Sequence, residues 1–368
     1  MAAPNRPVPL PWACTILSIF LGFLLTGPHS VKAVDGVELP PVLLQMMRND
    51  TVFKQLGLDE AEIRKVTDVL DRVDGEWWRS RNMQDAERNE TVNRLSAKVK
   101  DELRGILSKE SFSRLEQLER QALGPRMFLL ADVAEQLSLS PVTVEKMASI
   151  ALETNVSTTS LNKQLQDGGN ASEIESEQKA LVAKEQEAIV GLLTNGQKLR
   201  IRGLTGEPFD FGRVTRTLPR APELIQTPEN WLQGSASSLE QLRGSVVAVH
   251  FYAFQCINCQ RNLPHYQAWH QDYSDKGLVV IGIQTPETSA ERNAEQVKAA
   301  IKSSGIGYPI LMDPESKNWE SWGTTMWPTV YLLDRDGYIR AWWQGEMNWQ
   351  GNPGEKKMRA HIERLLAE

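Results

Sequence analysis

The sequence predicts two parts of different fold class: an all-helical N-terminal region followed by an α/β domain with a central mixed sheet. Aromatic residues are unevenly distributed, with 5 Phe, Trp or Tyr in residues 34–205 and 18 in residues 206–368. Apolar residues recur at helical spacing in the first part, whereas strand-like apolar runs alternate with helical patterns in the second. A chain of 368 residues is long enough for two or three domains.

The first 33 residues have the pattern of a secretory signal peptide. Arg6 precedes an apolar run over residues 13–25, and Val31-Lys32-Ala33 resembles a small-residue cleavage site. We expect cleavage after Ala33, removal of Cys14 with the signal, and export to the periplasm or another extracytoplasmic compartment. If the segment is not cleaved it would serve as a membrane anchor, although its apolar run is shorter than the roughly 20 residues of a spanning helix.

Residues 34–205 follow helical periodicity. A first apolar stripe contains Ile63, Val66, Leu70, Val73 and Trp77, and it places Trp78 at its margin. Asp59 and Glu62 form the pattern of a capping box at the start of this helix. A second stripe runs from Val92 to Leu107, after which Ser108 can cap a third helix that ends at Gly124-Pro125.

The helical layout then begins again. Ser140 is a candidate N-cap before Pro141, and the Leu-Leu-Thr of residues 192–194 matches the Ile-Leu-Ser of residues 106–108 at an offset of 86. We interpret residues 34–205 as a degenerate tandem repeat whose polar segment 162–180 is a connection or a pair of exposed helix ends. The layout resembles that of the Spy/CpxP-like periplasmic helical proteins, although their Leu-Thr-x-x-Gln motif is absent. Residues 206–218 are the expected linker.

The second half alternates strands and helices. Residues 246–252 predict a strand, residues 260–273 a helix, and residues 278–283 a strand buried on both faces. This βαβ order predicts parallel pairing. Two later strands, 329–333 and 338–342, flank Asp336-Gly337, a strong hairpin signal, and a last helix covers residues 355–366. Parallel and antiparallel strands together predict a mixed sheet in a domain over residues 219–368.

Cys256 and Cys259 lie between the first strand and its helix. A Cys-x-x-Cys pair at this place in a βαβ pattern is the signature of a thioredoxin-like redox site. Cysteines three residues apart at a helix start can close a disulfide, and the helix N-terminus favours the thiolate of the first one. Cys256 is therefore the predicted attacking thiolate, and Cys259 the thiol that resolves the mixed disulfide.

The segment 254–265, together with residues 277–282, Thr285-Pro286-Glu287 and Trp327-Pro328, carries a family resemblance. On these motifs residues 219–368, about 40% of the chain, resemble the thioredoxin-like domains of the TlpA/ResA group and of DipZ-type periplasmic thiol-disulfide oxidoreductases. The resemblance implies that Pro264 kinks the redox helix and that Trp327-Pro328 is a cis-proline turn beside the disulfide. Pro328 would then shape the groove for the substrate chain, with Trp327 at its rim.

His250 departs from the family pattern. Many members have a buried acidic residue six positions before the first cysteine, where it helps to move the proton of the resolving thiol. An imidazole, with a pKa closer to neutrality, can do the same work. The alternative is a histidine that only packs under the site.

Other site chemistries were weighed on the same residues. His265 points away from Cys259 on a continuous helix, and His270 lies about 16 Å along it, so neither can share a metal with the thiols. Gln260 occupies the position that haem attachment would require for histidine. A redoxin-type thiol peroxidase remains an alternative, although the Pro and Thr that precede a peroxidatic cysteine are absent. Copper handling by the two thiols alone and a binding module without turnover also remain open.

The sequence therefore predicts an exported enzyme that exchanges thiols and disulfides with protein partners and with an upstream redox partner. It needs no dissociable cofactor, because the cysteine pair carries the electrons. A net charge of −6 argues against a nucleic-acid partner. Whether it acts as an oxidase or a reductase is open, and the helical region could dock a partner, mediate dimerisation or act as a spacer.

Overall fold

The protein is described from a computed structural model that covers residues 37, 39–166 and 169–368; the predicted signal peptide lies outside these residues. The chain divides into two compact units. One unit, called the helical unit, ends at Thr217 and does not include Asp71–Arg79. The other, called the α/β unit, consists of Asp71–Arg79 and Leu218–Glu368. Within the described residues no helix has the length and apolar character of a membrane span.

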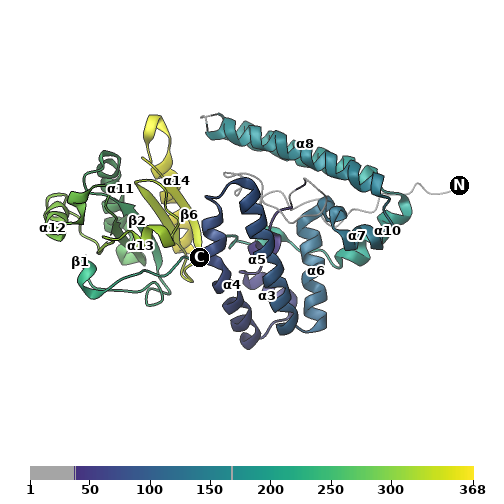
Figure 1. Cartoon of the computed structure of the whole chain (residues 1–368), viewed down its shortest axis with the longest axis horizontal. Coiled ribbons are helices and arrows are strands. Elements are labelled where there is room, and N and C mark those ends of the chain that lie inside the picture. The colour runs from purple at the N-terminus through teal and green to yellow at the C-terminus, as the bar shows by residue number, and fades with distance from the viewer. Residues whose placement is uncertain (1–36, 38, 167–168) are drawn as a thin grey trace. The chain divides into compact units, whose positions relative to one another are not determined.

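The helical unit is built from α-helices connected by short loops (Figure 1). Its helices are α2 (Val42–Met46), α3 (Asp50–Leu56), α4 (Glu60–Ser80), α5 (Asp85–Ile106), α6 (Lys109–Leu123), α7 (Ala131–Gln136), α8 (Pro141–Gln166), α9 (Ala171–Gly191) and α10 (Asn195–Thr205), with a 3-10 helix at Gly124–Leu129 and another at Phe211–Arg213. The order of two long helices and a shorter third helix occurs twice, first as α4 to α6 and then as α8 to α10. The polar segment 162–180 contains the end of α8 and the start of α9.

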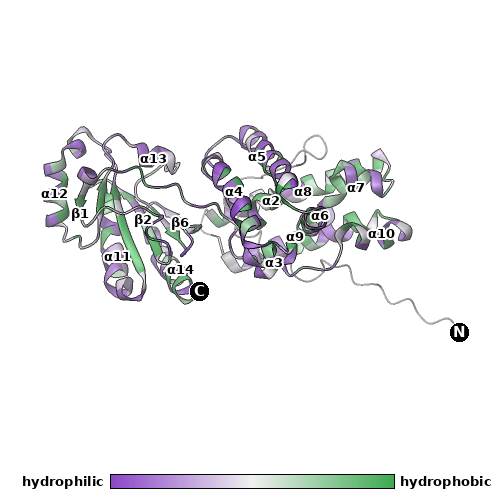
Figure 2. Ribbon diagram, turned by 90° about the horizontal axis from the view of Figure 1, so that it is seen from below, coloured by the Kyte–Doolittle hydropathy of each residue, from purple (hydrophilic) through white to green (hydrophobic). Residues whose placement is uncertain are grey.

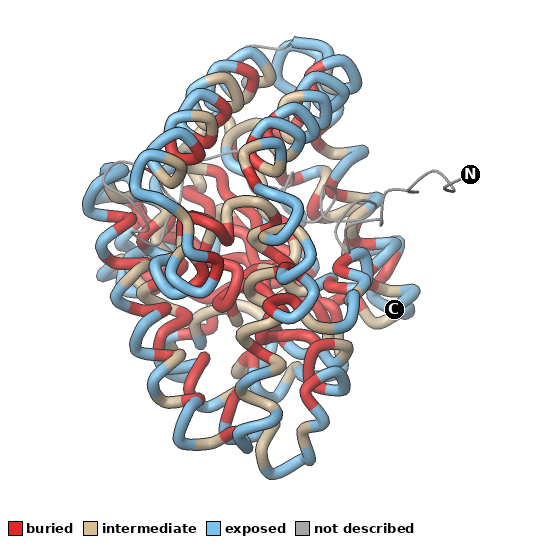
Figure 3. The backbone as a smooth tube through the Cα atoms, turned by 90° about the vertical axis from the view of Figure 1, so that its right-hand side faces the viewer, coloured by how far each residue is buried: buried red, intermediate tan, exposed pale blue. Residues whose placement is uncertain are grey.

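Local hydrogen bonds explain where these helices begin. Before α4, the side chain of Asp59 accepts from the backbone N–H of Glu62, and Glu62 accepts in return from the N–H of Asp59, which is the predicted capping box. Ser108 caps α6 by accepting from Ser111 N at 3.1 Å. The longer helices bury one side of their surface and expose the other, as Figure 3 shows, whereas all five residues of α2 are buried.

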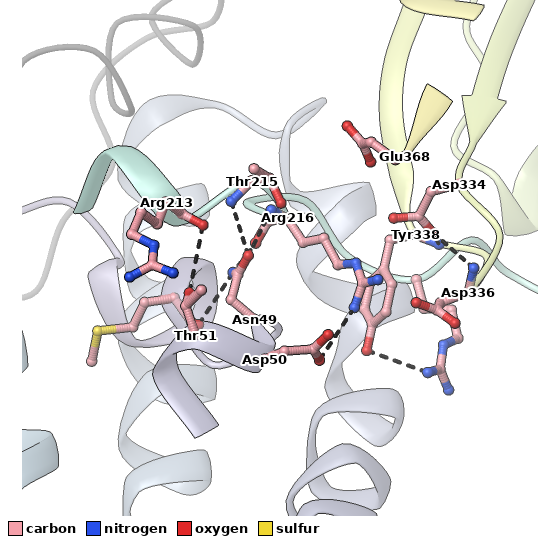
Figure 4. A network of polar contacts seen from close by, with 12 residues as sticks. Asn49, Asp50, Thr51, Arg213, Thr215, Arg216, Asp334, Asp336, Tyr338 and Glu368 are labelled. Atoms are coloured by element: carbon pink, nitrogen blue, oxygen red, sulfur yellow. Dashed lines mark hydrogen bonds and ion pairs between the residues drawn. The ribbon is translucent and has the colours of Figure 1, made fainter. Parts of the chain in front are cut away.

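The predicted linker packs onto the helical unit. Asn49 is 3% exposed, and its side-chain oxygen accepts from the backbone N–H groups of Thr215 and Arg216, each at 2.9 Å (Figure 4). Its amide group donates to the carbonyl of Arg216 at 2.7 Å. One buried side chain therefore satisfies three backbone groups of the segment that leads out of this unit.

The α/β unit contains the strands, which are the hydrophobic ribbons between more polar helices in Figure 2. Its strands are β1 (Trp231–Gln233), β2 (Val246–Tyr252), β3 (Leu278–Gln284), β4 (Ile310–Met312), β5 (Thr329–Leu333) and β6 (Ile339–Gln344). Its helices are α11 (Ile257–Tyr273), α12 (Ala294–Ser303), α13 (Lys317–Ser321) and α14 (Gly354–Ala367), with 3-10 helices at Pro228–Asn230, Ser274–Lys276, Ser289–Arg292 and Trp349–Gly351.

The six strands form one mixed sheet in the order β1-β4-β3-β2-β5-β6. Strands β2, β3 and β4 pair in parallel, whereas β5 pairs antiparallel with β2 and β6, and β1 pairs antiparallel with β4. This is the predicted fold class, a helical region followed by a thioredoxin-like α/β domain. The hairpin turn is held by Asp334, whose side chain accepts from the N–H groups of Asp336 and Tyr338 (Figure 4).

The sheet has two faces with different partners, because alternate residues of a strand point to opposite sides. On one face Ala248 and Tyr252 belong to a core shared with α11, α12 and α14. On the other face Phe251 makes edge contacts with Trp322 and with Tyr331.

Trp78 does not lie at the margin of the apolar stripe of its helix, as the sequence predicted. Trp78 is 3% exposed and belongs to the α/β unit, where its ring makes edge contacts with Tyr331 and Trp342 at centroid distances of 5.9 and 5.2 Å. The last part of α4 also carries Asp74, which accepts from the backbone N–H of Arg220 at 2.8 Å. The periodicity of α4 could not reveal this, because the partners of Trp78 lie more than 240 residues away along the chain.

Candidate redox site

The two cysteines lie where β2 passes into α11. β2 ends at Tyr252, a three-residue loop follows, and Cys256 occupies the N-cap position of α11 with φ −71° and ψ 116°. Its N–H donates to the carbonyl of Ala253 at 3.2 Å, which closes the loop as a turn. Cys256 is partly exposed, whereas Cys259 is 1% exposed in the first turn of the helix. Both are unpaired thiols in the structure.

This difference in burial separates the two thiols chemically. Burial raises the pKa of Cys259 far above that of a free cysteine. A hydrogen bond with Cys256 and the charge of Glu287 raise this pKa further, whereas a hydrogen bond with the backbone of Ala253 lowers it. Only Cys256 can meet a partner from solvent, and Cys259 keeps its proton until a reaction creates a need for its thiolate.

Trp327 and Pro328 lie in the loop before β5. The peptide bond between them is cis. The indole of Trp327 stacks on Trp319 with a centroid distance of 4.0 Å and donates to the carbonyl of Thr285 at 3.2 Å. Trp327 is partly exposed and packs against the core that contains Cys259. Two neighbouring apolar side chains, Ile257 after Cys256 and Met326 before Trp327, are 57% and 47% exposed.

His250 is fully buried on the same sheet face as Tyr252. Its ring stacks on Tyr266 at a centroid distance of 4.2 Å and lies 5.1 Å from the ring of Tyr252. On the neighbouring strand the residue in register is Gly282, and a Cβ there would lie 2.9 Å from the imidazole Nε2. The missing side chain of Gly282 therefore provides the space for this ring.

The imidazole of His250 does not keep its ordinary pKa. Burial lowers the pKa of His250 to about 3, because both ring nitrogens lack a hydrogen-bond partner and no acidic group compensates. His250 is thus neutral at physiological pH. The sequence position alone could not show this, since the shift comes from the packing of aromatic rings around it.

Further buried polar groups share this face of the sheet. The hydroxyl groups of Tyr252 and Tyr308 and the amide of Gln284 make no hydrogen bond to protein atoms. Burial raises the pKa of Tyr252 and of Tyr266, and the charge of a Cys259 thiolate would raise both further. The two phenols therefore adjoin both Cys259 and His250. Buried unpaired polar atoms of this kind are the usual sites of ordered internal water.

Glu291, which the sequence analysis missed, is a completely buried carboxylate in the 3-10 helix Ser289–Arg292. One oxygen accepts from the N–H of Gln255 at 2.8 Å, and the other accepts from Glu287 and Thr288 at 2.7 and 2.9 Å. The Thr-x-x-Glu pattern of residues 288–291 indicates a capping box, so the bond to Thr288 was detectable. The bond to Gln255, directly before Cys256, depends on tertiary structure.

The histidines considered as metal ligands lie elsewhere on α11. His265 is within 3.3 Å of the Asn348 side chain, and the ring of His270 makes an edge contact with Tyr308. Across the described ranges, no three His, Cys, Asp or Glu side chains gather in a group suited to a metal ion.

Comparison with known proteins agrees with this geometry. Residues 220–342 match the AhpC/TSA family. Protein DipZ of Mycobacterium tuberculosis is 32% identical over 234 residues, which cover 62% of this chain and 30% of DipZ. The thioredoxin-like protein YneN of Bacillus subtilis is 33% identical over 109 residues, or 30% of this chain and 62% of YneN. The thiol-disulfide oxidoreductase ResA of Bacillus thuringiensis is 27% identical over 119 residues, which cover 32% of this chain and 64% of ResA.

Solved structures align with 40% of the chain. A thiol-disulfide isomerase from Corynebacterium glutamicum aligns with a TM-score of 0.35 and 25% identity, covering 40% of this chain and 97% of its own. A thiol:disulfide interchange protein from Chlorobium tepidum aligns with a TM-score of 0.33 and 22% identity, covering 40% and 95%.

The match with DipZ is longer than the resemblance noted in the sequence. Its 62% of the chain exceeds the share of residues 219–368, so the similarity extends into residues before position 219. The present chain nevertheless spans less than a third of the length of DipZ. Residues 220–342 are therefore similar to the AhpC/TSA family, and the sheet order and the place of the Cys-x-x-Cys pair at a strand-to-helix turn agree with the predicted thioredoxin-like fold.

Proposed function

We propose that the protein is an exported thiol-disulfide oxidoreductase that exchanges disulfides with protein partners through Cys256 and Cys259. The observation that carries this proposal is the contrast between the two thiols. Cys256 is partly exposed at the start of a 17-residue helix, whereas Cys259 is buried in the first turn of that helix and has a raised pKa. The names of the relatives YneN and ResA support the same reaction class.

In the reducing direction, the Cys256 thiolate attacks one sulfur of a partner disulfide. The partner S–S bond breaks, a mixed disulfide forms and one partner thiolate leaves. Cys259 then loses its proton and attacks the sulfur of Cys256, which forms the Cys256–Cys259 disulfide and releases the second partner thiol. Two electrons pass to the partner, and an upstream dithiol must return them. The oxidising direction runs through the same mixed disulfide in reverse.

The surroundings of Cys256 suit an extended polypeptide partner. Pro328 and Trp327 form the turn beside the core that contains Cys259. Two exposed apolar side chains adjoin the site in sequence, Ile257 after Cys256 and Met326 before Trp327. We assign Trp327 and Pro328 to substrate binding. Replacement of Trp327 by Ala, with unchanged turnover of a protein disulfide, would remove that role from Trp327.

His250 is proposed to take part in proton transfer through its aromatic neighbours. The imidazole contacts Tyr252 and Tyr266, and a Cys259 thiolate would act on the hydroxyl groups of both. Because its pKa is low, the imidazole would not hold this proton; it would relay it through the phenols and internal water, accepting at one ring nitrogen while donating from the other. His250→Ala should slow resolution of the mixed disulfide between pH 6 and 8, whereas an unchanged rate over this range would reduce His250 to a packing residue.

Equilibration of the full chain in glutathione buffers tests the central proposal. The wild type should convert reversibly between two free thiols and one disulfide, counted by thiol alkylation and mass spectrometry. The Cys256→Ser and Cys259→Ser variants should form no intramolecular disulfide at any buffer ratio, so that the remaining thiol is either free or joined to glutathione. An irreversible or absent disulfide in the wild type would contradict the enzyme assignment. Rapid consumption of hydrogen peroxide by the reduced wild type would instead favour the peroxidase alternative.

A further inference from the structure

Glu291 connects two loops at the redox site. Its carboxylate holds the backbone of Gln255, which precedes Cys256, and the backbone of residues 287 and 288, which follow β3. A second bond joins the same loops, because the Thr288 hydroxyl donates to the side-chain oxygen of Gln255 at 2.8 Å. The turn that presents Cys256 is thus fastened to a segment 36 residues further along the chain.

The carboxylate of Glu291 is fully buried and is held by backbone groups alone. All three donors are backbone N–H groups, which is the arrangement that an acceptor-only carboxylate satisfies. The side chain is 0% exposed, so water screens its charge less than it would at the surface. A fixed anion therefore lies at the N-terminal end of α11, where the helix dipole would otherwise favour the thiolate of Cys256.

We propose that Glu291 is a positioning residue that fixes the redox turn and, through its charge, lowers the reduction potential of the Cys256–Cys259 couple. Where Cys256 is ionised in the reduced protein, a nearby carboxylate disfavours this second negative charge. The disulfide carries no charge and is not disfavoured. Glu291 therefore shifts the couple toward the disulfide and makes the dithiol a stronger electron donor. This inference rests on the proposed oxidoreductase function and adds a direction to it.

The test compares Glu291→Gln with the wild type as full chains in glutathione buffers above about pH 8.5, where a cysteine thiol is ordinarily ionised. Removal of the charge should decrease the equilibrium constant for oxidation of the dithiol by about tenfold, which corresponds to a potential more positive by about 30 mV. Glu291→Asp keeps the charge but shortens the reach to Gln255. It should leave the constant within about threefold of wild type.

Asp334→Asn is a matched control. Asp334 is also a buried carboxylate that accepts from two backbone N–H groups. It lies far from the redox pair, because the preceding residue, Leu333, pairs with Val247 at the start of β2, whereas Cys256 follows the end of β2. This variant should lower the stability of the domain without changing the potential. A shift as large as that of Glu291→Gln would show that the effect is general destabilisation and would overturn the proposal.

An unchanged or more negative potential in Glu291→Gln would also overturn it. If Glu291→Gln does not fold, the test uses Glu291→Asp instead. A change of more than tenfold from the wild-type equilibrium constant for oxidation of the dithiol in that variant would overturn the proposal. Failure of the proposed function has a different signature, because the wild-type pair itself would then not cycle between dithiol and disulfide.

Discussion

The indole nitrogen of Trp78 donates a hydrogen bond of 2.9 Å to the backbone carbonyl of Trp322, 244 residues further along the chain. The donor comes from the end of a helix in the predicted helical region, and the acceptor lies in the α/β unit. Together with Tyr331 and Trp342, this contact makes Asp71–Arg79 a structural part of the α/β unit. A thioredoxin-like domain cut at residue 219 would lack this part of its core.

Replacement of Trp78 by Ala should destabilise the α/β unit strongly. The change removes a side chain that is 3% exposed and leaves a cavity, so we expect the free energy of unfolding to fall by about 3 to 5 kcal/mol. Tryptophan fluorescence in a denaturant titration would measure this, because every tryptophan except Trp12 belongs to the α/β unit. Trp349→Ala, at a position 54% exposed, is the control with little expected effect. A loss below about 1 kcal/mol for Trp78→Ala would contradict its place in the core.

Gly282→Ala should reveal the close packing of His250. An added Cβ would lie 2.9 Å from the imidazole and 2.5 Å from Ile310 Cδ1, so we expect a loss of about 1 to 3 kcal/mol in the free energy of unfolding. A double-mutant cycle with His250→Ala should show a smaller cost of Gly282→Ala once the ring is absent. Additive costs in that cycle would show that Ile310, and not His250, limits the space.

The stability of the α/β unit should depend on pH through His250. Its pKa is about 3 in the folded protein against 6.5 for an unperturbed histidine, so the unfolded chain binds this proton more tightly. The free energy of unfolding therefore decreases as pH falls from about 6.5 towards 3, with a limiting slope of about 1.4 kcal/mol per pH unit from this group.

His250→Asn isolates this contribution, since the carboxylates are the same in both proteins. The difference in unfolding free energy between wild type and variant should decrease between pH 6 and pH 4, as measured by denaturant titrations at several pH values. A difference that is independent of pH over this window would mean that the folded protein accommodates a charged imidazole.

Serine substitution of each cysteine should separate their roles. Cys259→Ser cannot resolve the mixed disulfide and should accumulate covalent complexes with partner proteins, which disappear on reduction in a gel assay. Cys256→Ser lacks the accessible thiol and should form none. Equal trapping by both variants would contradict the order of attack proposed from burial.

Local patterns in the sequence predicted most of the fold. The stripe from Ile63 to Trp77, the strand of residues 246–252 and the turn at Asp336-Gly337 depend on spacing between near neighbours, and such spacing determines the secondary structure. The Cys-x-x-Cys pair likewise needs only one helical turn to bring its thiols together. These features were therefore correctly assigned from residues a few positions apart.

Tertiary structure decided what these elements contact and how their side chains are charged. The sequence indicated that Trp78 belongs to a helix but not that its indole reaches Trp322, and Glu291 was found only in the structure, where it holds Gln255. It placed His250 under the site, but only burial among aromatic rings lowers the pKa of that imidazole. The physical reason is that hydrogen-bond partners and the local dielectric environment come from segments brought together by packing, whereas periodicity and turn preference act within a few residues.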